Sequence, residues 1–277
     1  MLSYARSGGT LLNQCLASMV NTVVISEVNP NGGGWGKEME NSVDTIWGQA
    51  KEWYDIELCE REYYSALIEL ERYCEEKGLH LVVRDWVYAS FAEIKYNNYS
   101  PIKKLEVYHK LSKMTRVIPF AFIRDSVDVW ISLGMEKTNK FYSHYKPYLY
   151  EIIANNIIFF KYEDFCMNPL EEMQKICKYL GIMYNSNFVY EYFENKANGN
   201  TQYTYASEAR LISPKERKII SRSKIREINT SSEMKYCNKI LSYSTNYYDG
   251  FSGWFRIESN KAGNLLNYYL QKIHRIV

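Results

Sequence analysis

A short turn near the start of the chain has the residue types that bind phosphate-like anions. The residues Arg6-Ser7-Gly8-Gly9-Thr10 follow an apolar stub, Leu2–Ala5, and lead directly into a run with helical spacing. A turn between a strand and a helix directs several backbone N–H groups at one point, at the positive end of the helix dipole. The two glycines let a ligand approach the backbone, the arginine adds a charge and the threonine adds a hydroxyl donor. By itself such a turn can also be purely structural, and it lacks the G-x-x-x-x-G-K-S/T pattern of nucleotide triphosphatases.

A second candidate anion site lies in the middle of the chain. Val117–Ile123 has the composition of a strand, Arg124 follows it directly, and Ser132 lies eight residues beyond the arginine. In an open α/β sheet, ligands bind at the carboxyl ends of the strands. An arginine at that edge can hold a phosphate through two parallel hydrogen bonds. The alternative is a surface pair between Arg124 and Asp125, with Ser126 as the N-cap of the next helix.

The elements that position these residues follow an α/β pattern, in which short β-branched or aromatic runs alternate with segments of helical spacing. We expect one domain spanning residues 1–277, with a central, mostly parallel sheet flanked by helices. The expected strands are Leu2–Ala5, Thr22–Ser26, Leu79–Arg84, Val117–Ile123 and Ile157–Tyr162. The expected helices are Leu11–Val20, segment Val43–Lys77 ended by Gly78, Pro169–Leu180 ended by Gly181, and Ser213–Asn229. Two stretches, Val28–Asn41 and Ala197–Ile212, resist assignment and are either binding loops or ordinary surface loops.

Composition excludes several classes of protein. The chain has 277 residues, a net charge of +2 and 46% hydrophobic residues, which is typical of a soluble globular protein and too weakly basic for nucleic-acid binding. The six cysteines form no C-x-x-C pair and the four histidines have no ligand spacing, so we expect buried thiols and no metal site. No segment is apolar enough to span a membrane and no signal peptide precedes the first strand, so we expect a cytoplasmic protein.

The two candidate anion sites, taken in order, resemble those of the sulfotransferases that use 3′-phosphoadenosine-5′-phosphosulfate (PAPS). That family has a strand, a Lys/Arg-Ser-Gly-x-Thr turn and a helix, and later an arginine at a strand end with a serine eight residues further on. A third landmark is an aromatic-Glu-Asp strand end, followed by a proline-initiated helix that ends in Leu-Gly. It is matched here by Tyr162-Glu163-Asp164, Pro169 and Leu180-Gly181. The resemblance covers the chain up to Gly181 and implies an α/β fold of the P-loop nucleotide-binding type.

The resemblance also implies a role for each matching residue. The residues expected to hold the 5′-phosphosulfate are Arg6, Ser7, Gly8, Gly9, Thr10 and Leu11. Arg124 and Ser132 are expected to hold the 3′-phosphate, and Tyr162 to lie near the adenine, although a tyrosine at a strand end can also be a core residue. The family closes over the cofactor with a later loop, for which Ala206–Arg210 and Ser213–Arg217 are the candidates.

Sulfuryl transfer to a hydroxyl requires a base for the acceptor proton and positive charge at the leaving phosphate. Glu27 is the candidate base because it follows the second strand, at the sheet edge that carries the turn. Protein-tyrosine sulfotransferases and some bacterial relatives place a base glutamate there. Asp85, at the end of a neighbouring strand, is the runner-up, and Glu27 could instead be an exposed loop carboxylate. Arg6 is the candidate on the leaving-group side, and Arg84 resembles a family residue directed at the sulfuryl oxygens.

The sequence therefore predicts an enzyme that moves a sulfuryl group from PAPS to a small-molecule or peptide acceptor, through a hydroxyl, and releases adenosine 3′,5′-bisphosphate (PAP). This scheme requires no metal. It leaves open a P-loop kinase-like nucleotide enzyme, which Mg²⁺-dependent ATP binding would reveal. It also leaves open a non-catalytic nucleotide-binding module, which would bind PAP without turnover. Composition does not identify the acceptor, because the 26 tyrosines and 6 tryptophans can line an aromatic pocket or fill the core.

Overall fold

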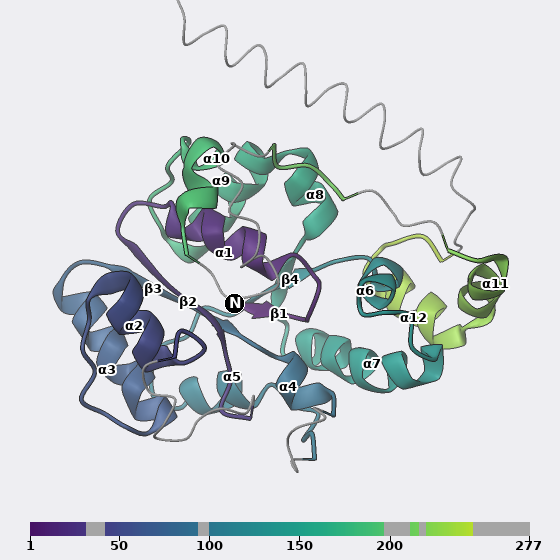
Figure 1. The fold of residues 1–277 in the computed structure, drawn as a ribbon, viewed down its shortest axis with the longest axis horizontal. Helices are drawn as coiled ribbons and strands as arrows, with labels where there is room; N and C mark the ends of the chain where they lie inside the picture. Colours follow the sequence, from purple (N-terminus) through teal and green to yellow (C-terminus); the bar gives the residue numbers. More distant parts are fainter. Residues whose placement is uncertain (32–41, 94–99, 197–210, 216–219, 246–277) are drawn as a thin grey trace, which may run out of the picture.

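A computed structural model shows a parallel five-stranded sheet between two layers of helices (Figure 1). It describes residues 1–31, 42–93, 100–196, 211–215 and 220–245. The strands are β1 (Leu2–Ser3), β2 (Thr22–Val28), β3 (His80–Asp85), β4 (Phe120–Ile123) and β5 (Ile158–Lys161). Their order in the sheet is β2-β3-β1-β4-β5, so the segment after β1 lies between the ends of β3 and β4. The expected α/β fold is confirmed, and each of the five predicted strands is present.

One face of the sheet is covered by the helix that follows the first turn and by three later helices (Figure 1). These are α1 (Gly9–Ala17), α8 (Tyr162–Met167), α9 (Pro169–Leu180) and α10 (Phe188–Glu191), with a 3₁₀ turn at Tyr192–Glu194. Their apolar side chains pack on those of β2, β3 and β4, with Leu16, Phe122 and Ile176 fully buried. This packing fixes α1 over the sheet, with its amino end at the carboxyl ends of the strands.

The opposite face carries the remaining helices of the described residues. Helices α2 (Ile46–Tyr54) and α3 (Tyr63–Glu76) lie over β2 and β3. Helix α5 (Glu106–Leu111) contributes side chains to the same apolar cluster. Over β1 and β4 lie α4 (Tyr88–Phe91), α6 (Ser126–Ser132), α7 (Thr138–Ala154), α11 (Arg222–Thr230) and α12 (Ser232–Ile240). None of the helices in this described part of the chain is long and apolar enough to cross a membrane.

Several predicted helices have different bounds. The helix expected at Leu11–Val20 is α1 and starts two residues earlier. Segment Val43–Lys77 holds two helices, because Asp55 ends α2 in a left-handed conformation and the Glu62 carboxylate caps α3. The helix expected from Ser213 was wrongly placed: residues 213–215 are not helical, and α11 begins after Ser221, whose hydroxyl is the N-cap. The Ser-Pro signal therefore did not mark a helix start.

The longest helix of the described residues, α7, was not predicted. It has 17 residues and contains Pro147, which is unfavourable inside a helix. Its buried side chains Phe141, Tyr145, Tyr148 and Ile152 recur at helical spacing and pack on the central strands. That spacing was the signal in the sequence, and the proline obscured it.

Candidate active site

The turn after β1 leads sharply into α1. Arg6 and Gly8 both adopt left-handed backbone conformations, with φ of 69° and 86°, and the Ser7 N–H donates to the Tyr4 carbonyl at 3.1 Å. In the part of the chain that the structure describes, no side chain caps the amino end of α1. A Cβ at Gly8 would lie 2.4 Å from Cδ2 of Tyr162, so only glycine fits there. The chain therefore presents the first turn of α1 at the carboxyl end of the sheet, as an anion site requires.

Arg84, near the end of β3, connects this turn with the end of β2. Its side chain is buried, its Nη1 donates to Thr10 Oγ1 at 3.2 Å, and its Nη2 donates to Glu27 Oε1 at 2.5 Å. A Cβ at Gly9 would lie 2.6 Å from Arg84 Nε, so the guanidinium lies against the glycine backbone. Burial lowers the pKa of Arg84, and the Glu27 carboxylate acts in the opposite direction. Thr10, Glu27 and Arg84, all singled out from the sequence, thus form one hydrogen-bonded cluster.

Glu27 reaches this cluster because β2 contains a bulge. Along the two strands Ile25 pairs with Val83 but Val28 pairs with Asp85, so β2 has one residue more than β3 in this interval. Glu27 takes up the irregularity with a left-handed φ of 53°. Bulges commonly re-aim a side chain next to a binding site. The Glu27 side chain remains 23% exposed, so a ligand can reach its carboxylate.

Asp85, the other candidate base, faces the opposite side of the sheet. Neighbouring residues of a strand alternate between faces, so Asp85 and Arg84 point apart. Asp85 Oδ1 accepts from Asn29 Nδ2 at 2.7 Å, and the same nitrogen donates to Ser90 Oγ at 3.2 Å. Burial raises the pKa of Asp85 to about 7, although the hydrogen bond from Asn29 lowers it. That pKa suits proton transfer, but the residue is only 4% exposed and lies away from the turn.

The second candidate anion site adjoins the first. Arg124 follows β4, is 8% exposed, and lies over the Tyr162 ring at 4.7 Å from its centroid. Its Nη1 donates to the Arg6 carbonyl at 3.4 Å, and Arg6 Nε donates to Ser132 Oγ at 3.0 Å. The cap of α6 is Asp125, whose side chain accepts from the Val127 N–H, so Ser126 is not the N-cap considered from the sequence. The two motifs, more than a hundred residues apart in the chain, therefore meet directly.

Several donors at this junction have no hydrogen-bond partner among the described residues. Ser7 Oγ, Arg84 Nε and Arg124 Nε are buried and unpaired there. A buried donor left without an acceptor costs about 1–3 kcal/mol, and more for a charged group. Such donors fit an anionic ligand that supplies oxygen acceptors, and their places at the ends of β1, β3 and β4 fit a nucleotide with more than one phosphate-like group. The residues present are thus compatible with PAPS.

Two further sequence predictions can be placed, and one cannot. Leu11 is partly buried and packs against the core beneath α1. Tyr162 is buried between Gly8 and Arg124, and its hydroxyl accepts from the Lys215 N–H at 3.4 Å. The candidate closing loop at residues 206–210 lies outside the described residues, as do residues 216 and 217 of the other candidate.

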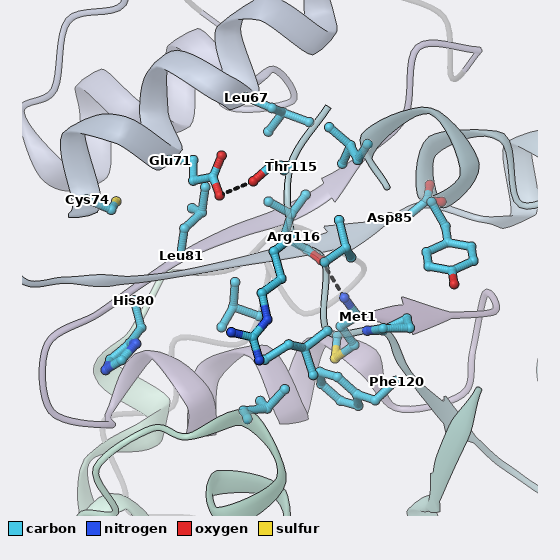
Figure 2. Close-up of a pocket in the computed structure, with 18 of the residues that line it drawn as sticks. Met1, Leu67, Glu71, Cys74, His80, Leu81, Asp85, Thr115, Arg116 and Phe120 are labelled. Atoms are coloured by element: carbon cyan, nitrogen blue, oxygen red, sulfur yellow. Dashed lines mark hydrogen bonds between the residues drawn. The ribbon is translucent and has the colours of Figure 1, made fainter. Parts of the chain in front are cut away.

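A cavity of about 600 Å³ follows β3 from His80 at its amino end to Asp85 at its carboxyl end (Figure 2). Its wall includes His80 and Phe120, the first residues of β3 and β4, and across it Thr115 Oγ1 donates to Glu71 Oε1 at 2.5 Å. Ligands of open α/β sheets bind at the carboxyl ends of strands, whereas these are the amino ends. Asp85 also lines this cavity, whereas its lining does not include Arg6, Glu27, Arg84 or Arg124.

Comparison with known proteins bears on the second anion site. Residues 109–238 match the family model described as a sulfotransferase domain. This part of the chain is similar to a sulfotransferase domain. The matched residues include Arg124, Ser132 and Tyr162, whereas the turn at Arg6, the base candidate Glu27 and Arg84 precede them. The family resemblance seen in the sequence is thereby confirmed, and it supports sulfuryl transfer as the general type of reaction.

Two solved structures are similar to most of this chain. The sulfotransferase domain from the Synechococcus PCC 7002 olefin synthase has 13% sequence identity and a TM-score of 0.50, covering 88% of this chain and 93% of its own. At this identity the likeness concerns the fold alone. The sulfotransferase domain from the curacin biosynthetic pathway has 12% identity and a TM-score of 0.46, covering 88% and 97%. A comparison with curated proteins gave no match.

Proposed function

We propose that the protein transfers a sulfuryl group from PAPS to a hydroxyl of a small-molecule or peptide acceptor and releases PAP. The observation that carries the proposal is the junction of the two anion sites, where Arg6 Nε donates to Ser132 Oγ at 3.0 Å beside the buried Arg124. A 3′-phosphate and a 5′-phosphosulfate on one nucleotide require two such sites close together. A nucleoside triphosphate requires only one phosphate-binding turn, normally with the lysine that this turn lacks.

Each group of the nucleotide has its own residues in this proposal. Arg6 to Leu11 hold the 5′-phosphosulfate through backbone N–H groups and the Arg6 charge. Arg124 and Ser132 hold the 3′-phosphate, and Tyr162, which already lies against the Arg124 guanidinium, borders the adenine. When bound, PAPS supplies the sulfuryl group. Arg84 adds a buried positive charge beside the turn, where negative charge develops during transfer.

Glu27 takes the proton of the acceptor hydroxyl. It is the carboxylate that contacts the Arg84 cluster and is also accessible, whereas Asp85 points to the other face of the sheet. Oε1 of Glu27 accepts from Arg84 at 2.5 Å, which orients the carboxylate toward the turn. Arg84 thus has two functions, because it fixes the base and provides charge at the same place.

Ligand-dependent thermal unfolding tests the donor. PAP at one hundred times its dissociation constant stabilises the fold by about 2.7 kcal/mol, or roughly 5 °C in Tm for a chain of this size. AMP should stabilise far less, and Mg²⁺ should have no effect. Arg124→Ala should weaken PAP binding by about 1.5–3 kcal/mol and leave AMP binding almost unchanged, because it removes a charge-assisted contact to the 3′-phosphate.

Arg72→Ala is the matched control, since Arg72 is an exposed arginine of α3. Equal stabilisation by ATP–Mg²⁺ and PAP would contradict the proposal and favour a kinase-like enzyme. Firm PAP binding, with no sulfate transferred from labelled PAPS to any component of a host-cell extract, would favour a binding module.

A further inference from the structure

The structure assigns a positioning role to Gln49, which holds the bulge of β2 in the form that brings Glu27 to Arg84. The assignment rests on the proposed function of Glu27 as the base. Gln49 does not contact the turn or the Arg84 cluster in the interactions described above, so it would act through the backbone of β2. Its side chain is completely buried on α2.

The Gln49 side chain makes, with one residue of β2, the hydrogen bonds that a neighbouring strand would make. Since β2 is at the edge of the sheet formed by the described residues, the outward N–H and C=O groups of its residues have no strand beside them there. The Ser26 N–H donates to Gln49 Oε1 at 2.6 Å, and Gln49 Nε2 donates to the Ser26 carbonyl at 2.7 Å. One side-chain amide therefore makes both hydrogen bonds that a strand would make, on the residue immediately before Glu27.

The register shows why this residue matters. Without a bulge, the pairing of Ile25 with Val83 would continue as Ser26 with Arg84 and Glu27 with Asp85. Paired residues share a face of the sheet, so Glu27 would then lie on the face of Asp85, away from Arg84. The extra residue moves Glu27 to the face of Arg84, and the register changes immediately beyond the residue that Gln49 holds.

Gln49 is itself fixed by the start of α2. The Thr45 side chain is the N-cap and accepts from the Gly48 N–H at 3.0 Å, while the Gln49 N–H donates to the Thr45 carbonyl at 3.0 Å. These contacts set the rotation of α2 and therefore the direction of the Gln49 side chain. The amide is planar and carries a donor NH2 group and an acceptor oxygen side by side, so it can bond the N–H and the C=O of one residue at the same time.

A second residue of α2 provides a matched control. The Val24 N–H donates to the Tyr54 hydroxyl at 2.9 Å, and the same hydroxyl donates to the Val24 carbonyl at 3.0 Å. Tyr54 thus covers the edge of β2 as Gln49 does, but two residues earlier, where the register with β3 is regular. If Gln49 only covers the edge, removal of either pair of hydrogen bonds should have the same consequences.

The experiment compares Gln49→Met with Tyr54→Phe, because each removes one donated and one accepted hydrogen bond to β2 with little change of shape. Tm, PAP affinity by calorimetry, and the turnover of labelled PAPS with cell extract or with water as acceptor are measured for both. Gln49→Met should lower kcat by roughly 10- to 100-fold, as a misplaced catalytic group does, with PAP affinity within about twofold of the wild type. Tyr54→Phe should lower Tm to a similar extent but retain kcat.

Two further variants separate the possible failures. Glu27→Gln should lower kcat by roughly 10²–10⁴-fold, and adding Gln49→Met to it should cause no further loss, because the positioned group is already absent. Full turnover by Glu27→Gln, or no turnover of PAPS by the wild type, would overturn the proposed function itself. An inactive Glu27→Gln together with a Gln49→Met that behaves like Tyr54→Phe would overturn only the role of Gln49. If Gln49→Met does not fold, Gln49→Asn, whose amide is one methylene too short, should show the same loss of kcat.

Discussion

Replacement of Gly8 by alanine tests the packing on which the first anion site depends. Gly8 has a φ of 86°, and an added Cβ would lie 2.4 Å from Cδ2 and 2.8 Å from Cε2 of Tyr162. That ring cannot easily move away, because it is 4% exposed, has the Arg124 guanidinium over one face and contacts the Phe122 ring edge-on. The alanine must therefore displace either the turn or the ring.

The expected magnitude is the sum of two costs. A non-glycine residue in the left-handed region costs about 1–2 kcal/mol, and overpacking of a buried site costs about 1–3 kcal/mol. Gly78 isolates the first cost, since it has a φ of 66° and an added Cβ would meet nothing within 4 Å. With an unfolding entropy of about 2.1 cal/mol/K per residue, 1 kcal/mol corresponds to roughly 2 °C for this chain. We expect a fall in Tm of about 2–4 °C for Gly78→Ala and about 4–10 °C for Gly8→Ala.

Thermal unfolding followed by circular dichroism, with and without PAP, measures both effects. Gly8→Ala should also lose the stabilisation by PAP, whereas Gly78→Ala should keep it, because Gly78 lies at the end of α3, outside the candidate site. Equal falls in Tm for the two variants would show that the turn does not pack on Tyr162 as described. The structural basis of the first anion site would then be wrong.

Two other predictions concern buried acids. Burial raises the pKa of Asp85 to about 7 from an ordinary 3.8. Its contribution to stability is therefore complete below about pH 4 and is lost as the pH rises through 7. Urea unfolding should give a lower free energy of unfolding at pH 8 than at pH 5, and this difference should be smaller in Asp85→Asn. An unchanged pH dependence in that variant would mean that Asp85 is not the buried acid. Glu163, whose pKa burial likewise raises to about 7, accepts from the Tyr243 hydroxyl at 2.5 Å. Tyr243→Phe should therefore lower the free energy of unfolding by about 1.5–3 kcal/mol at pH 8. A smaller decrease at pH 8 than at pH 5 would contradict a hydrogen bond from Tyr243 to the ionised Glu163.

The approach of several candidate site residues to one another could be predicted from the sequence, because the carboxyl ends of parallel strands lie at one edge of a sheet. Residues that follow separate strands, such as Arg6 and Arg124, could be expected to approach each other for that reason alone. The order of strands was not predictable, and it decides that the segment after β1 lies between Arg84 and Arg124. Hence their common contact with the turn appeared only in the structure.

The choice between Glu27 and Asp85 also required the structure. Both residues follow β-branched runs, and alternation along a regular strand would place Glu27 on the face of Asp85. A bulge depends on how one strand pairs with its neighbour and has no marker in the local sequence here, since the residue with φ of 53° is a glutamate, not a glycine. Gln49 was missed for a similar reason, because a buried glutamine on a helix has no distinctive spacing.

The side chains that α2 places along β2 also determine where the sheet ends. An uncovered edge strand offers a row of backbone groups with which a strand of another molecule can pair, and such pairing leads to aggregation. Gln49 and Tyr54 engage those groups at alternate residues, Ser26 and Val24, so the sheet cannot extend there unless α2 first leaves its position. The packing of one nine-residue helix thus closes this edge of the sheet to pairing with a further strand at Val24 and Ser26.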